Sequence, residues 1–176
     1  MKKTLKSFAL IISTVLFLVG CGSGSGNNGA SSNSGNSSEK TVSYLTEDGR
    51  FEIIAVECTE HAKTQNHEAF VSVRIKVKNN TDRDYDYVEF MGQSYDKNED
   101  NLNNIGFQIR DIDAGHSAWS SNPSGGTSLE NYGGFKLKSY EIADEKEGSL
   151  YRQEVVDFDK KIYISLDEMN IIKSDK

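Results

Sequence analysis

Two histidines and a group of glutamates are the first side chains of this sequence that could hold a metal ion. His61 and His67 lie six positions apart in one polar segment, and nearby carboxylates could complete a ligand set: Glu57, Glu60 and Glu68. Imidazole and carboxylate groups bind zinc, but paired histidine ligands usually stand about three to five residues apart. The wider spacing favours ordinary surface histidines, and metal binding by His61 and His67 stays open.

Alternating aspartates form a second candidate cation site. Asp82, Asp84 and Asp86 stand at every second position of a polar segment. Carboxylate oxygens are calcium ligands, and extracellular sites of this kind bind with dissociation constants of about 10⁻⁴ to 10⁻³ M. The three aspartates are therefore kept as a possible weak calcium site.

A third acidic segment, Asp96 to Asp100, resembles the beginning of an EF-hand calcium loop. Such a loop needs glycine at its sixth position and a bidentate glutamate at its twelfth. This chain has Asn101 and Phe107 there. The segment is therefore predicted to be a solvated turn.

Nucleophilic catalysis would need a serine or cysteine beside a base. The sequence has no Gly-x-Ser-x-Gly segment, and Cys58 ends an apolar run that begins at Phe51 and has no basic residue in it. A thiol in such surroundings is expected to be a buried small apolar group rather than a reactive one. The sequence predicts no enzyme activity, no catalytic residue and no cofactor.

The first 20 residues have the pattern of a signal peptide. Three lysines fall in the first six residues, and an apolar run of 12 residues follows at positions 8–19, interrupted only by Ser13 and Thr14. A membrane-spanning helix needs about 20 apolar residues, whereas this length fits the apolar region of a signal peptide. Residues 1–20 are therefore predicted to be removed.

The run ends in Leu18-Val19-Gly20-Cys21. This sequence resembles the lipobox of bacterial lipoproteins at all four positions. The resemblance implies that the thiol of Cys21 receives a diacylglyceryl group and that a peptidase cuts before it. We therefore expect a protein anchored in the bilayer through Cys21, on the extracellular face of the cell membrane as in Gram-positive bacteria.

A linker follows the cysteine. All 17 residues from position 22 to 38 are Gly, Ser or Asn except Ala30. Such a segment cannot bury enough apolar surface to offset the entropy of ordering, so residues 21–40 are predicted to form a flexible tether. Removing residues 1–20 takes away three lysines and no acid, which changes the formal charge from −7 to −10. An acidic chain is repelled by nucleic acid, so nucleic-acid binding is not expected.

Residues 41–176 are long enough for one domain and read as a series of short strands. The clearest strand spans 69–78, where Val71, Val73, Ile75 and Val77 alternate with polar residues. Further strands are predicted at 51–58, 85–95, 102–109 with a bulge at Gly106, 117–121, 135–142 and 161–166, with a long loop over 122–134. The segment 150–158 fits a strand better than the alternative of a short helix. About seven short strands separated by turns favour an all-β fold, an antiparallel sandwich.

The segment 73–88, which contains Lys78-Asn79-Asn80-Thr81-Asp82, and the later Tyr95-Asp96-Lys97-Asn98 resemble the FxLYD domain. Gly92 and Ser94 stand where that signature has Phe and Leu. The match covers about residues 71–121, and the domain is also similar to the telokin-like domains of Gram-positive lipoproteins. Both resemblances imply an immunoglobulin-like β-sandwich, and neither brings a catalytic residue.

Aromatic side chains supply the last candidate surface. Tyr85, Tyr87 and Tyr95 have odd numbers on one predicted strand and are therefore expected to share a face. That face belongs either to the sandwich core or to a surface for an envelope protein or a glycan. The leading hypothesis is a non-catalytic binding or accessory domain of the cell envelope. The alternative is a ligand- or metal-binding lipoprotein that delivers a solute to a membrane transporter. Solute-binding proteins of this class usually have two α/β lobes, and this domain is too short for that.

Overall fold

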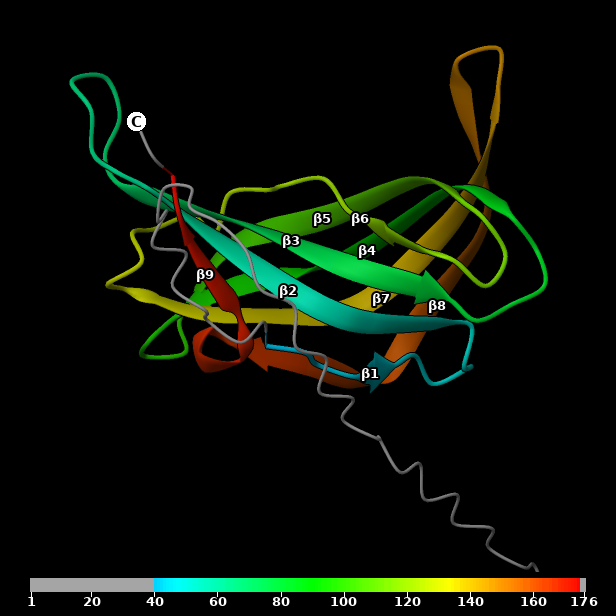
Figure 1. The fold of residues 1–176 in the computed structure, drawn as a ribbon, viewed down its shortest axis with the longest axis horizontal. Coiled ribbons are helices and arrows are strands. Elements are labelled where there is room, and N and C mark those ends of the chain that lie inside the picture. Colours follow the sequence, from blue (N-terminus) through cyan, green and yellow to red (C-terminus); the bar gives the residue numbers. More distant parts are fainter. Residues whose placement is uncertain (1–39, 175–176) are drawn as a thin grey trace, which may run out of the picture. The chain divides into compact units, whose positions relative to one another are not determined.

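A computed structural model describes residues 40–174 of the chain (Figure 1). The predicted signal peptide, Cys21 and all of the predicted tether except Lys40 lie outside these residues. The described part contains nine strands and one short 3₁₀ helix, in the order β1 Tyr44–Leu45, β2 Phe51–His61, β3 Phe70–Asn79, β4 Tyr85–Asp96, β5 Asn101–Ile112, β6 Ser117–Trp119, β7 Tyr132–Lys146, β8 Ser149–Ser165, η1 Leu166–Glu168 and β9 Asn170–Lys173. Within residues 40–174, no helix is long and apolar enough to cross a bilayer.

The strands form two sheets that lie one behind the other in Figure 1. One sheet has the order β1-β2-β3-β6, with β9 also paired to β2, and the other has the order β5-β4-β7-β8. The series β2-β3-β6 and β5-β4-β7-β8 match strands A-B-E and C′-C-F-G of the immunoglobulin fold. The prediction of an all-β, immunoglobulin-like sandwich is therefore confirmed. Two details differ from it, because the described residues hold nine strands rather than seven and β9 pairs with β2 in parallel.

The core fills the space between the sheets, as the alternation in the sequence requires. Val71, Val73, Ile75 and Val77 of β3 are all buried in one apolar cluster. Phe51 of β2 touches rings from the opposite sheet at centroid distances of 5.1–6.0 Å: Tyr85, Phe90 and Tyr140. The contacts with Phe90 and Tyr140 are edge-to-face, a geometry that stabilises a core beyond the burial of area alone.

Most predicted strands are confirmed, but several boundaries are wrong. The segment 150–158 is part of one continuous strand, β8, and β7 begins at Tyr132 within the predicted loop. The predicted bulge at Gly106 is wrong, because Gly106 pairs in regular register with Met91. A β-carbon at Gly106 would meet only the end of the flexible Glu89 side chain.

The expectation that three tyrosines share a face is also wrong. Tyr85 lies in the core with Val88 and Phe90, whereas Tyr87 lies on the outer face, where its hydroxyl donates to Glu89 at 2.7 Å. Neighbouring β5 shows the same change of alternation, because Ile109 and Ile112 both face the core with Asp111 between them at φ 51°. A residue in the left-handed region interrupts the period of two, which the sequence does not reveal.

The strand β4 connects two different ends of the domain. It starts near the turn that follows Asn79, and we call this region the Asn79 end: residues 46–50, 79–84 and 112–116. It finishes at Asp96, and we call the opposite region the Tyr95 end: residues 95–101, 131–134 and 163–168. Figure 1 shows β4 running between these two groups of loops.

Asn79 closes its end of the sandwich. Its side chain is 0% exposed, and Nδ2 donates to the carbonyl oxygens of Arg83, Ile112 and Asp113 at 2.8, 3.3 and 3.2 Å. Its Oδ1 accepts from the backbone and the hydroxyl of Thr81 at 3.0 and 2.8 Å. One buried amide thereby ties together the turns after β3 and β5.

A second polar cluster at the Asn79 end joins the two sheets. The carboxylate of Asp48 accepts hydrogen bonds from the hydroxyl of Tyr140, from Thr46 Oγ1 at 2.7 Å and from the backbone of Arg50 at 3.2 Å. Burial acts to raise the pKa of Asp48, but the bonds from Tyr140 and Thr46 outweigh it and lower the pKa. Arg50 in turn holds Glu154 of β8 with two bonds, at 2.5 and 3.1 Å.

Candidate functional site

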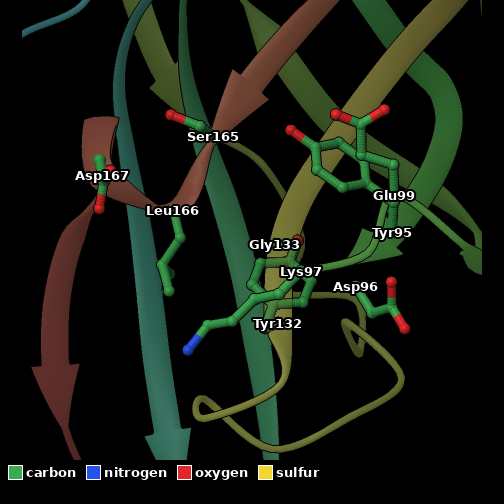
Figure 2. Close-up of a pocket in the computed structure, with 9 residues that line it drawn as sticks. All are labelled: Tyr95, Asp96, Lys97, Glu99, Tyr132, Gly133, Ser165, Leu166 and Asp167. Carbon is green, nitrogen blue, oxygen red and sulfur yellow. The ribbon is translucent and has the colours of Figure 1, made fainter.

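The Tyr95 end carries two adjoining hollows. The larger, of about 320 Å³, lies between the end of β4, the turn that follows it, the start of β7 and η1. Its lining residues are 95–97, 99, 132–133 and 165–167, and Figure 2 shows them around the opening. The smaller, of about 170 Å³, is lined by Tyr95, Glu99, Lys136 and Tyr163. Because Tyr95 and Glu99 border both hollows, we treat them as one site, the Tyr95 cleft.

Two glycines make room for the ring of Tyr95. A β-carbon at Gly134 would lie 2.7 Å from Tyr95 Oη, and one at Gly133 would lie 3.0 Å from Tyr95 Cδ2. The hydroxyl of Tyr95 donates to the carbonyl oxygen of Ile164 on β8, at 3.4 Å. The ring therefore lies against the two glycines of β7, and its hydroxyl reaches the backbone of β8.

The turn after β4 places Glu99 between the hollows. Asp96 Oδ1 accepts from the backbone nitrogens of Asn98 and Asp100 at 2.8 and 3.0 Å, which shapes the turn. Glu99 follows with φ 66°, a conformation that costs a residue with a β-carbon free energy and that glycine adopts freely. Across the smaller hollow, Lys136 Nζ donates to Asn101 Oδ1 at 2.5 Å.

The cleft has a negative electrostatic environment around its tyrosine. Burial raises the pKa of Tyr95, and the nearby carboxylates of Glu168 and Glu99 raise it further. Glu168 is itself fixed, because it accepts from the backbone and the hydroxyl of Ser165 at 2.8 and 2.9 Å. Tyr132, which also borders the cleft, is fully buried, and its hydroxyl has no hydrogen-bond partner among residues 40–174.

This arrangement offers aromatic faces beside charged groups of both signs. Tyr163 is 56% exposed on β8, and the flanking side chains of Glu99, Lys97 and Lys136 can accept or donate hydrogen bonds. Such a surface can hold a polar ligand that also has an apolar face.

The two histidines singled out in the sequence do meet in one hollow. His61 and His67 both line a space of about 180 Å³ that also borders Phe70. His61 stacks on Phe70 with a centroid distance of 4.4 Å, and its Nε2 lies 2.8 Å from Ser72 Oγ. These contacts fix His61 within the sheet. In the described part of the chain, no three His, Cys, Asp or Glu side chains are grouped to hold a metal.

The three alternating aspartates do not converge. Asp84 accepts from the backbone of Ala114 at 2.7 Å, whereas Asp86 accepts from the backbone of Glu145 at 3.0 Å. Asp84 and Asp86 thus bind different segments of the fold, and Asp82 lies exposed in the turn. Their visible role is to fix turns and strand ends.

The prediction for Cys58 is confirmed. Its side chain is fully buried, and this burial raises the pKa of the thiol to about 12. A thiol that stays protonated at neutral pH is a poor nucleophile. The predicted lipid attachment site, Cys21, lies outside the described residues.

Sequence reasoning missed Tyr163, Lys136 and Glu99. Tyr163 and Lys136 are directly paired across β7 and β8, but each looks like an ordinary residue of an alternating strand. Glu99 lies in a segment that the sequence identified only as a solvated turn. The one signal available in the sequence was the aromatic residue Tyr163 within the predicted strand 161–166.

Comparisons with known proteins give little further guidance. No protein-family model matches the chain, and a search of curated proteins finds no match either. A similar solved structure is that of IrmA from Escherichia coli, with 11% sequence identity and a TM-score of 0.37 over 69% of this chain and 92% of IrmA.

Proposed function

We propose that this chain is a bacterial lipoprotein, anchored by Cys21 on the extracellular face of the cell membrane, whose β-sandwich is a non-catalytic binding module of the cell envelope. The observation that carries the proposal is the apolar run that ends in Leu18-Val19-Gly20-Cys21 and leads into a Gly/Ser/Asn segment. A folded domain follows from Lys40 onward. Leader, acceptor cysteine, spacer and domain thus occur in the order that a surface lipoprotein requires.

The physics of anchoring supports the role of Cys21. A single fatty chain holds a protein only marginally, whereas two chains on one glycerol give stable attachment, because each buried methylene contributes about 0.8 kcal/mol. Cys58 cannot serve as a second lipid site, since its side chain is fully buried. Cys21 is the remaining thiol of the chain.

The domain is held firmly where the spacer joins it. The backbone nitrogen of Lys40 donates to Asn170 Oδ1 at 2.7 Å, and Asn170 Nδ2 donates back to the Lys40 carbonyl oxygen at 2.9 Å. Lys40 Nζ also donates to the carbonyl oxygen of Asp167, at 2.9 Å. Asp167 borders the Tyr95 cleft, so the spacer joins the domain beside the candidate binding surface.

Binding rather than catalysis is favoured by the site itself. The Tyr95 cleft combines a fixed aromatic ring with polar side chains, and it has no serine or cysteine hydrogen-bonded to a histidine among its lining residues. The FxLYD-like segment contributes Asn79 and the turn after it, which close the sandwich. The exposed cleft is therefore the surface that we assign to an envelope partner.

The anchor is tested by replacing Cys21 with serine in the native host, with Ser23→Ala as the matched control. Cells are fed an alkyne-labelled fatty acid, and membrane and medium fractions are compared. We expect Cys21→Ser to lose the label and to accumulate as precursor or in the medium, while Ser23→Ala stays labelled and membrane-bound. A Cys21→Ser protein of mature size that remains wholly in the membrane would contradict the proposal.

A further inference from the structure

We propose that the Tyr95 cleft binds a glycan, with two consecutive sugar units over its two hollows. This inference rests on the proposed function and names the class of its ligand. It follows from three features of the site: the paired aromatic faces, the mixed polar groups, and the way the hollows adjoin.

The aromatic residues offer flat apolar surfaces at fixed positions. Tyr95 is held across Gly133 and Gly134, and Tyr163 extends from the neighbouring strand with 56% of its surface exposed. A pyranose ring has a face of C–H groups that packs against an aromatic ring, while its hydroxyls point outward to polar partners. Tyrosine suits this contact because its ring is apolar and its hydroxyl can still form a hydrogen bond.

The polar residues match a neutral polyol better than a polyanion. Three carboxylates border the cleft, Asp96, Glu99 and Asp167, against two ammonium groups, Lys97 and Lys136. An anionic polymer would meet a surface with an excess of negative charge, in a domain that is acidic overall. Sugar hydroxyls and amides, by contrast, can both donate to carboxylates and accept from lysines.

The shape of the cleft suits a linear chain. The hollows, of about 320 and 170 Å³, lie on the two sides of Tyr95 and Glu99, which border both, so one linear ligand that passes these two residues would contact both hollows. A single sugar would use only half of the lining, which predicts that affinity rises with chain length up to the number of units that the cleft can hold.

A purely structural role for these residues would give a different mutational pattern. Tyr95 covers two glycines and so contributes to the sheet, but Tyr163 is exposed and Glu99 occupies a backbone conformation that glycine would relax. Tyr163→Ala and Glu99→Gly therefore remove ligand contacts without removing buried structure. Tyr151→Ala is a matched control, because Tyr151 is 53% exposed on the same strand and pairs with Asp144, whereas Tyr163 pairs with Lys136 at the cleft.

The experiment measures binding of the full chain, solubilised in detergent, to N-acetylglucosamine oligomers of one to four units by titration calorimetry. We expect the affinity to rise from one sugar unit to two or more. Tyr163→Ala and Glu99→Gly should each weaken binding about tenfold, which is the effect of losing one good contact. The control Tyr151→Ala should leave the affinity within about twofold of wild type. A polyglycerol phosphate probe is expected not to compete.

Several outcomes would overturn the glycan proposal. The first is the absence of binding both to the oligomers at millimolar concentration and to insoluble peptidoglycan. The second is equal binding by Tyr163→Ala and wild type. The third is binding of polyglycerol phosphate in place of the oligomers. Melting of each variant by circular dichroism shows whether it is folded. Fatty-acid labelling of Cys21 is measured in the same preparations, so a protein that is lipidated but binds no glycan is distinguished from one that is not lipidated.

Discussion

The polar groups at the two ends of β4 have different surroundings. At the Asn79 end, a fully buried amide and the Asp48 carboxylate are surrounded by hydrogen bonds from the protein itself. At the Tyr95 end, comparable groups line open hollows, and the buried Tyr132 hydroxyl has no partner within residues 40–174. Polar groups are bonded within the fold at both ends, but at the Tyr95 end Asp96 and Lys136 also border a cleft, where their remaining hydrogen-bonding capacity can meet a ligand.

The comparison predicts that substitutions at the Asn79 end damage stability and leave binding unchanged. The largest loss is expected for Asn79→Ala, which leaves three carbonyl groups and Thr81 without their partner. Buried polar groups that lose their hydrogen bonds cost about 1 to 3 kcal/mol, so we expect about 3 kcal/mol here. Chemical denaturation measures it, with the exposed neighbour Asn80→Ala as control. A loss of under about 1 kcal/mol for Asn79→Ala would show that the amide does not close this end.

A smaller loss is expected for Tyr140→Phe. The change removes the hydroxyl that donates to Asp48 but keeps the aromatic ring packed against Phe51. A hydrogen bond to a charged group is worth about 1.5 to 3 kcal/mol, which sets the expected destabilisation at about 2 kcal/mol. Unfolding in urea provides the measurement, and Tyr151→Phe on the exposed hairpin is the control. Equal stabilities of Tyr140→Phe and wild type would rule out a role for this bond.

The same bond predicts a dependence of stability on pH. Because the pKa of folded Asp48 is lowered, its contribution is present above the ordinary aspartate value of about 3.9 and is lost as pH falls through the folded value. The free energy of unfolding should therefore fall as pH drops below about 4, and less steeply in Tyr140→Phe. Urea unfolding at pH 3 to 7 tests this, and identical slopes for the two proteins would contradict it.

Substitutions at the Tyr95 end are expected to have the smallest effects on stability. Glu99→Gly relieves a left-handed conformation and should raise the free energy of unfolding by up to about 1 kcal/mol. Tyr163→Ala should change it by less than about 0.5 kcal/mol, because the side chain is largely exposed. Denaturation curves give both values. A loss of about 2 kcal/mol in either variant would mean that the cleft is a structural element like the Asn79 end.

The sequence predicts structure that depends on neighbouring residues better than structure that depends on contacts between distant ones. The strand at 70–79 was evident because its period of two is local, and the immunoglobulin-like fold followed from the number and spacing of such strands. β1 and β9 were missed because they are short and depend on distant partners, such as the Lys40–Asn170 pair. The outward position of Tyr87 coincides with a change of alternation in the neighbouring strand, where Asp111 has φ 51°.

The Tyr95 cleft was the least predictable part for the same reason. The signature around Tyr95 and Asp96 was visible, but the site also needs Tyr163 and residues 165–167, which are about 70 positions away and contain no motif. Only the pairing of β4 with β7 and of β7 with β8 brings them together. The alternating aspartates, by contrast, were visible in the sequence, but Asp84 and Asp86 bind separate segments of the fold.

Chemical-shift mapping tests the central claim most directly, because it observes both ends in one sample. The isotope-labelled chain is titrated with a tetramer of N-acetylglucosamine, and the amide signals of every residue are followed. We predict saturable shifts at residues 95–101, 132–136 and 163–167, and none at residues 46–50 or 79–84. Shifts centred on the Asn79 end, or no shifts at any concentration up to several millimolar, would contradict the division of the domain into a closed end and a binding end.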